Sequence, residues 1–132
     1  MKLLLVIVCC ALLGASLFAM KHTRNLAIGT WGGEGISMQV SEKGAEIEFD
    51  CAHGQIAQPI LLDSHGNFAA AGTFAHEHGG PVLRDEKSYE IHARYSGHVA
   101  RNVMSLVVAY EGKNAGTFTL ELDHEPNLRK CR

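Results

Sequence analysis

The sequence predicts an all-β fold, in which an antiparallel up-and-down meander of seven to eight short strands closes into a small barrel with one disulfide. Apolar and polar residues alternate with a period of two through most of the chain from Ile36 to Asp123, as in strands with one buried face. Turn-forming residues separate these runs at short intervals, which is typical of antiparallel all-β domains. No segment keeps a helical period over the dozen residues that a stable helix needs.

The N-terminus reads as a signal peptide over residues 1–19, followed by a single barrel domain over residues 20–132. Lys2 precedes an apolar run over Leu3–Leu13, the length expected for a signal-peptide core. Cleavage after Ser16 and cleavage after Ala19 both remain open. An uncleaved anchor is the alternative, because the uncharged stretch from Leu3 to Met20 reaches the lower limit of a bilayer span.

Charge and composition exclude several functional classes. Removal of residues 1–19 from the 132 leaves 113 residues and a formal charge of 11 minus 14, or -3, which provides no field for nucleic acid. The charged fraction of 20% argues against disorder. We therefore expect a secreted or periplasmic protein that contacts neither nucleic acid nor, after cleavage, the membrane.

Two cysteines remain after signal cleavage, because Cys9 and Cys10 lie in the signal segment. In an oxidising compartment the isolated pair Cys51 and Cys131 predicts a disulfide. Its loop spans 131 minus 51, or 80, positions, for which chain entropy gives an upper figure of about 4–5 kcal/mol. Two free buried thiols are the alternative.

The first strands are predicted over Ile36–Val40 and Ala45–Cys51. The polar loop Ser41–Gly44 between them indicates a hairpin in which Gly44 takes a positive φ. A strand over Gln55–Leu62 follows. It contains Pro59, which predicts an edge, bulged or bent strand, since proline cannot donate to a sheet ladder.

Longer strands follow the turn at Asp63–Asn67. An alanine-rich strand is predicted over Phe68–His78, where Gly79, Gly80 and Pro81 end it. The next strand covers Tyr89–Tyr95, with a break expected at Ser96–His98. The last two strands, joined by the turn Glu111–Asn114, are predicted over Val103–Tyr110 and Thr117–Asp123.

A barrel is preferred to a sandwich because consecutive short turns make up-and-down neighbours and closure removes exposed edges. Aromatic side chains at inward positions are numerous enough to fill a narrow interior, which makes a large cavity doubtful. These residues are Phe49, Phe68, Phe74, Tyr89, Tyr95, Tyr110 and Phe118.

The tripeptide Gly29-Thr30-Trp31, together with the all-β meander, resembles the Gly-x-Trp signature of the calycin barrels, the lipocalin and avidin-like families. The resemblance implies that Trp31 closes one end of a barrel and that a small apolar ligand binds inside. The plain alternative is that Trp31, the sole tryptophan, is a core residue.

A second resemblance is carried by Phe49–Gly54, which is similar to the cysteine-bearing early strand of small exported lysozyme-inhibitor barrels. It implies a disulfide-stapled inhibitor of an exported enzyme. The Ser-Gly-x-x-Tyr motif of those proteins is absent, because Tyr95-Ser96-Gly97 has a different order.

His76 and His78 are the candidate metal ligands. Residues two apart on a strand point to one side, so both imidazoles would face one ion, with His92 or a carboxylate completing the set. The cupin barrels use such a His-x-His pair, but their glycine and glutamate are replaced here by Ala70 and by Val82 or Leu83. A solvated strand end is the alternative.

No catalytic residue is predicted. The sequence holds no Gly-x-Ser-x-Gly elbow, phosphate loop or Cys-x-x-Cys pair. Glu46, Glu48 and Asp50 alternate as expected for the solvated face of an amphipathic strand rather than for a glycosidase pair.

The sequence thus predicts a small exported barrel that acts by binding, without a cofactor and without catalysis. Its expected contact surface is the barrel mouth with Trp31, His76, His78 and Tyr95. A small apolar ligand requires a concave apolar pocket. A protein inhibitor instead requires a filled barrel and a protruding loop, and a metalloenzyme would use His76 and His78.

Overall fold

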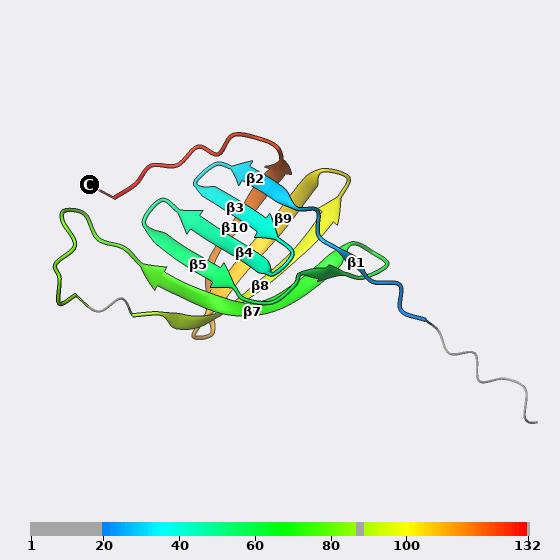
Figure 1. Cartoon of the computed structure of the whole chain (residues 1–132), viewed down its shortest axis with the longest axis horizontal. Coiled ribbons are helices and arrows are strands. Elements are labelled where there is room, and N and C mark those ends of the chain that lie inside the picture. Colours follow the sequence, from blue (N-terminus) through cyan, green and yellow to red (C-terminus); the bar gives the residue numbers. More distant parts are fainter. Residues whose placement is uncertain (1–19, 87–88, 132) are drawn as a thin grey trace, which may run out of the picture.

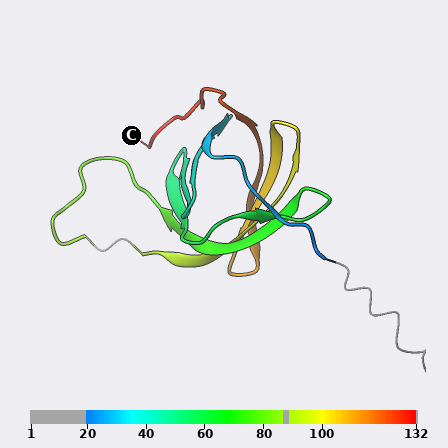
Figure 2. The same ribbon diagram turned by 45° about the vertical axis from the view of Figure 1, so that its right-hand side comes forward.

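The computed structural model describes residues 20–86 and 89–131, so the predicted signal peptide lies outside the described residues. Within these ranges eight antiparallel strands form a closed barrel, and no helix is present. The predicted fold class, an up-and-down meander with a disulfide between Cys51 and Cys131, is confirmed. Figures 1 and 2 show the barrel with one long loop extending from it.

Strand order around the barrel follows the chain. Each strand forms backbone hydrogen bonds with the next one in the order β2, β3, β4, β5, β7, β8, β9 and β10. The barrel closes where β10 pairs with β2. The short strands β1 and β6 pair outside the barrel. The bounds are β1 Arg24–Asn25, β2 Gly29–Gly33, β3 Ile36–Ser41, β4 Gly44–Phe49, β5 Ala52–Ile56, β6 Leu61–Leu62, β7 Asn67–His76, β8 Ile91–Ala100, β9 Val103–Tyr110 and β10 Lys113–Leu122.

We call one end of the barrel the loop end. It is formed by the turns at Glu34-Gly35, Asp50-Cys51 and Glu111-Gly112 and by the β7–β8 loop, residues 77–90. The chain enters the barrel at the opposite end, where β2 begins (Figure 1).

The barrel interior is filled by side chains. Trp31 and Tyr95 are 1% and 0% exposed and belong to one continuous apolar core. The Tyr95 hydroxyl donates to the Thr73 carbonyl at 2.6 Å. The Tyr95 ring fits here because Gly54 has no side chain: a Cβ at Gly54 would lie 2.0 Å from the tyrosine oxygen.

The break expected at Ser96–His98 is wrong. β8 continues through these residues to Ala100, and the turn follows at Arg101-Asn102. Gly97 faces the Phe68 ring, and a Cβ at Gly97 would lie 2.6 Å from it. The glycine is therefore required by packing inside the barrel rather than by a turn.

The strand predicted over Gln55–Leu62 is also corrected. β4 ends at Phe49, two residues before the predicted end at Cys51, and the chain turns at Asp50-Cys51, so β5 begins at Ala52 and ends at Ile56. The chain then leaves the barrel around Pro59, whose missing N–H suits a non-ladder segment. Only Leu61 and Leu62 return to a ladder, in the outer pair with β1.

The two strands that flank the long loop, β7 and β8, each end two residues short of the predicted boundary on the side of the loop. β7 ends at His76, so His78 belongs to the loop, and β8 begins at Ile91. Tyr89, predicted to face inward, is 78% exposed. The six other predicted interior aromatics are buried or half-buried.

Other local predictions hold. β9 has the predicted bounds, and Gly44 closes the β3–β4 turn with a φ of 149°. The described residues, 20–86 and 89–131, include no helix long and apolar enough to cross a membrane.

Candidate functional site

The two aromatic residues assigned to the barrel mouth, Trp31 and Tyr95, lie inside the barrel instead. The Trp31 indole N–H donates to the Ala27 carbonyl at 3.0 Å, just before β2 begins. Burial raises the pKa of Tyr95 by disfavouring its charged form. Neither ring is available at the surface, so these residues serve the core.

The loop end of the barrel is closed by aromatic rings. Phe49 packs against Phe74 and against Phe118 with ring centroids 5.3 Å apart in each pair. Tyr110 stacks on Phe74 at 4.9 Å, and its hydroxyl lies 3.2 Å from Nε2 of His76. His76 therefore caps an aromatic cluster at the rim of the barrel.

Two hollows lie on the barrel wall and are open to solvent. One, of about 610 Å³, is lined at the surface by Gln39, Glu46 and Gln55. The other, of about 360 Å³, lies beside Asn67, His98 and Ser105. Neither is an enclosed space within the barrel.

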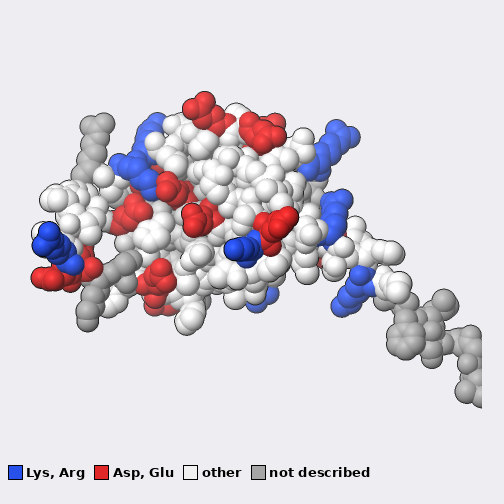
Figure 3. Space-filling view, in the orientation of Figure 1, with Lys and Arg blue, Asp and Glu red and all other residues white. Residues whose placement is uncertain are grey.

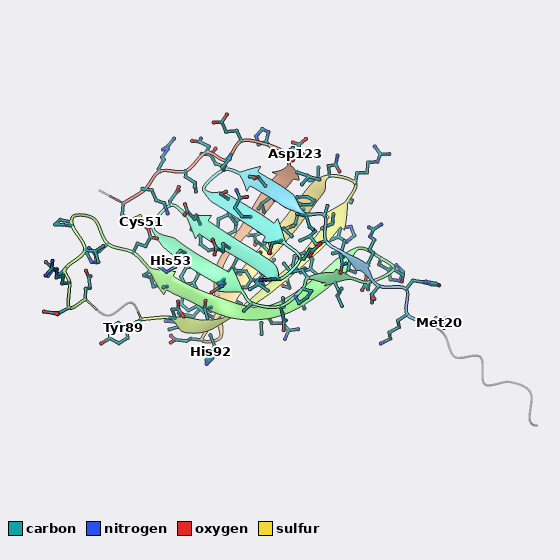
Figure 4. The ribbon with its side chains drawn as sticks, viewed as in Figure 1. Met20, Cys51, His53, Tyr89, His92 and Asp123 are labelled. Atoms are coloured by element: carbon teal, nitrogen blue, oxygen red, sulfur yellow. A yellow bond between two sulfur atoms is a disulfide. The ribbon has the colours of Figure 1, made fainter. Side chains whose placement is uncertain are left out.

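The β7–β8 loop projects from the barrel (Figures 1 and 2), and its described residues include exposed apolar side chains. Val82 is 78% exposed, Leu83 72% and Tyr89 78%. Figure 4 shows Tyr89 extending from the chain toward the same end of the molecule as Cys51. The loop therefore carries three large exposed apolar side chains that do not belong to the barrel core.

Hydrogen bonds fold this loop back on itself. The Leu83 N–H donates to the Glu86 carboxylate at 3.1 Å, and the Glu86 N–H donates to the Leu83 carbonyl at 3.1 Å. The His78 ring contacts the Gly79 carbonyl at 2.8 Å through Nδ1 and the Glu86 carboxylate through Nε2. Val82 and Leu83 therefore lie within a turn closed by an ion pair.

The base of the loop is tied to the barrel by charged groups. Glu77 lies 2.9 Å from Nδ1 of His53 on β5 and 3.5 Å from the ammonium of Lys130. Lys130 also lies 3.5 Å from Glu48 on β4. Because these side chains are partly exposed, each pair adds little stability, but together they fix where the loop leaves the barrel.

The structure does not bring His76, His78 and His92 to one point. His76 contacts Tyr110, whereas His78 contacts Glu86 in the loop. His92 follows Ile91, which pairs with Phe74, so His92 faces the opposite side of the sheet from the Phe74 and His76 side chains. In residues 20–86 and 89–131 no group of three or more His, Cys, Asp or Glu side chains is arranged to hold a metal ion.

Comparison with models of protein families, with curated proteins and with solved structures gives no match for this chain. The site is therefore interpreted from its own geometry.

Of this loop, only His78 was placed in the contact surface expected from the sequence. Val82 and Leu83 were noted only as positions that replace the cupin glutamate, and Tyr89 was predicted to be an inward-facing strand residue. The available signal was two adjacent apolar residues directly after Gly79-Gly80-Pro81, a strand-ending segment that places them in solvent.

The His78–Glu86 pair predicts a pH dependence of the loop. The Gly79 carbonyl first, and Glu86 second, raise the pKa of His78 above its ordinary 6.5, while His78 lowers the pKa of Glu86 below 4.5. Stabilisation from His78 is complete below pH 6.5 and is lost as pH rises through the raised pKa. Stabilisation from Glu86 is complete above pH 4.5 and is lost as pH falls through the lowered pKa.

We expect Glu86→Gln to lower the pKa of His78 without restoring its ordinary value, because the Gly79 carbonyl remains. Titration of the His78 ring protons by NMR measures this shift. The matched control is Glu90→Gln, an exposed acid of the same loop. Equal pKa values for His78 in both variants would contradict the assigned ion pair.

Proposed function

We propose that the chain is a small exported protein that binds a protein partner through the β7–β8 loop and performs no catalysis. The observation that carries this proposal is the exposure of Val82, Leu83 and Tyr89 on a projecting loop whose barrel has a filled interior. Large apolar groups of this kind dominate the energy of protein interfaces when a partner buries them. The disulfide is consistent with an oxidising, exported environment.

The charge around the loop favours a basic partner. Among the described residues 20–86 and 89–131, the loop end carries the acidic side chains Glu34, Glu48, Asp50, Glu77, Asp85 and Glu86 and the basic side chains Arg84, Lys113, Arg129 and Lys130. Figure 3 shows red and blue atoms together on the loop, blue side chains at the upper left, red atoms across the middle of this face, and several blue side chains on the far right. An acidic surface raises the association rate with a cationic protein and orients it.

Among protein-binding functions, inhibition of an exported enzyme of the lysozyme type has specific support. An inhibitor of that kind was expected to combine a filled barrel with a protruding loop, and both features are present. A small apolar ligand inside the barrel has less support, because the aromatic cluster occupies the loop end. The geometry of the described residues gives no support for a metal centre at His76 and His78.

The test uses a lysozyme and, in parallel, other basic exported hydrolases. Calorimetric titration is expected to show binding of at least one of them, with inhibition of its activity. Leu83→Asp should weaken that binding by about 30-fold or more, because a buried hot-spot group contributes about 2 kcal/mol or more. The matched control is Val103→Asp, an exposed apolar position at the opposite end of the barrel, which should leave affinity unchanged.

A second measurement separates the small-ligand alternative. Trp31 is the sole tryptophan and lies in the interior, so its fluorescence reports any molecule that enters the barrel. Titration with a fatty acid is expected to leave the emission unchanged. Saturable quenching by the fatty acid, or equal affinities of Leu83→Asp and Val103→Asp for the enzyme, would overturn the proposal.

A further inference from the structure

The last segment of the chain, residues 123–131, forms a strap on the outside of the barrel. It leaves β10 near the Asp123 label in Figure 4 and runs back along the barrel to the loop end. There Cys131 is bonded to Cys51 in the β4–β5 turn, with the two Cα atoms 5.2 Å apart. The strap thus returns the C-terminus to the base of the β7–β8 loop.

Backbone contacts hold the first half of the strap against β2. Asp123 donates its N–H to the Thr30 carbonyl at 2.8 Å. Asn127 donates to the Gly33 carbonyl at 3.0 Å and accepts from the Gly35 N–H at 2.8 Å. Gly32 lies directly beneath, since a Cβ there would lie 2.1 Å from the His124 carbonyl oxygen.

The second half of the strap reaches the loop base. The backbone N–H of Arg129 donates to the Asp50 carboxylate at 2.7 Å. The Lys130 ammonium donates to the Phe49 carbonyl at 3.2 Å and lies 3.5 Å from Glu77, the first residue of the loop. The strap therefore supplies one of the contacts that fix the loop.

The core of the barrel does not depend on the strap. The described core and the apolar residues packed against it end at Leu122 in β10, and no residue of 123–131 belongs to them. Cys51 is exposed and Cys131 is half-buried, so a reductant in solvent reaches the bond. Local opening of such an element costs much less than global unfolding.

We infer that the Cys51–Cys131 disulfide is a redox-sensitive latch, and that its reduction releases the strap from β2 and from Glu77 while the barrel stays closed. A dithiol carries out the exchange: its thiolate attacks one sulfur, a mixed disulfide forms, and its second thiol displaces that sulfur. The protein gains two electrons and two protons as two thiols, and the dithiol becomes a disulfide. Release also removes the Lys130 ammonium from Glu48 and Glu77, which makes the loop end more acidic.

Hydrogen exchange with and without dithiothreitol tests the latch. In the oxidised protein the amides of Gly35, Asn127 and Arg129 should be protected by their strap hydrogen bonds. After reduction we expect them to exchange on the order of 100-fold faster, as in local opening, while amides of β4, β8 and β9 keep their protection. Unchanged strap amides would overturn the inference, and so would loss of protection throughout the barrel.

Gly32→Ala provides a second test that leaves both cysteines in place. The added Cβ meets backbone rather than a flexible side chain, so the strap must move off β2 while the disulfide remains oxidised. We expect faster exchange at Asn127 and Gly35 in the oxidised variant. The control is Ser105→Ala at an exposed position of β9, and equal exchange in the two variants would contradict the inference.

Discussion

Replacing Trp31 with alanine is expected to lower the free energy of unfolding by about 3–5 kcal/mol, the range for deletion of a large buried aromatic group. Trp31 is the only large side chain of β2, whose sequence is Gly-Thr-Trp-Gly-Gly. β2 is also the strand that closes the barrel, and it pairs with β10 through only three residues, Trp31 to Gly33. Loss of the ring therefore weakens closure as well as the core.

Chemical denaturation followed by circular dichroism measures this loss. Ile28→Ala, an exposed apolar position just before β2, is the control and should change stability by no more than about 0.5 kcal/mol. Trp31→Phe should fall between the two, because it keeps part of the buried area and loses the bond to Ala27. A loss below about 1 kcal/mol for Trp31→Ala would be too small for a core residue and would contradict its assigned place in the interior.

Removal of the disulfide has the second largest expected effect. The double variant Cys51→Ser/Cys131→Ser should lose about 2–5 kcal/mol of unfolding free energy, because the open chain gains entropy in the unfolded state. The bond closes 80 positions, so most of this effect arises without any change in the folded barrel. We expect the far-ultraviolet spectrum of a β protein to be retained at low temperature.

Denaturation of the oxidised protein, the reduced protein and the double variant separates the contributions. The reduced protein and the double variant should agree within about 1 kcal/mol, since both lack the same constraint. The matched control is Ser105→Ala at an exposed site on β9. Stability of the double variant equal to that of the oxidised protein would show that the unfolded chain is not constrained by this bond.

The barrel was predictable because the chain alternates with a period of two and its turns are short. Each alternating run has one apolar face that must be buried, and closing the sheet into a barrel buries the apolar faces of all strands at once. Errors arose because a glycine can indicate either a turn or a position where a neighbouring strand leaves no room for a side chain. Gly97 was taken as a turn signal, but it makes room for Phe68 within β8; Gly44 follows the predicted turn with a positive φ and also lies against the Ile56 carbonyl of β5. Local sequence does not distinguish these cases, because the deciding contact comes from another strand.

The candidate site was less predictable than the fold. Trp31 and Tyr95 were placed at a mouth because aromatic residues serve equally as ligand contacts and as core. The choice depends on barrel width, which follows from how the strands tilt and pair around the whole ring. The exposure of Val82, Leu83 and Tyr89 likewise depends on β7 ending at His76 and β8 starting at Ile91, a boundary that no local pattern fixed.

The strap also determines which terminus is suited to a fusion partner or to immobilisation on a surface. It carries the C-terminus to the loop end, whereas Met20 lies beyond the opposite end (Figures 1 and 4). A label or carrier fused to the C-terminal side of the strap would stand at the base of the β7–β8 loop, where Cys131 lies against Glu77, and would compete sterically with a partner. A barrel immobilised through its N-terminus would instead direct the loop outward, which is the orientation to use on a sensor surface.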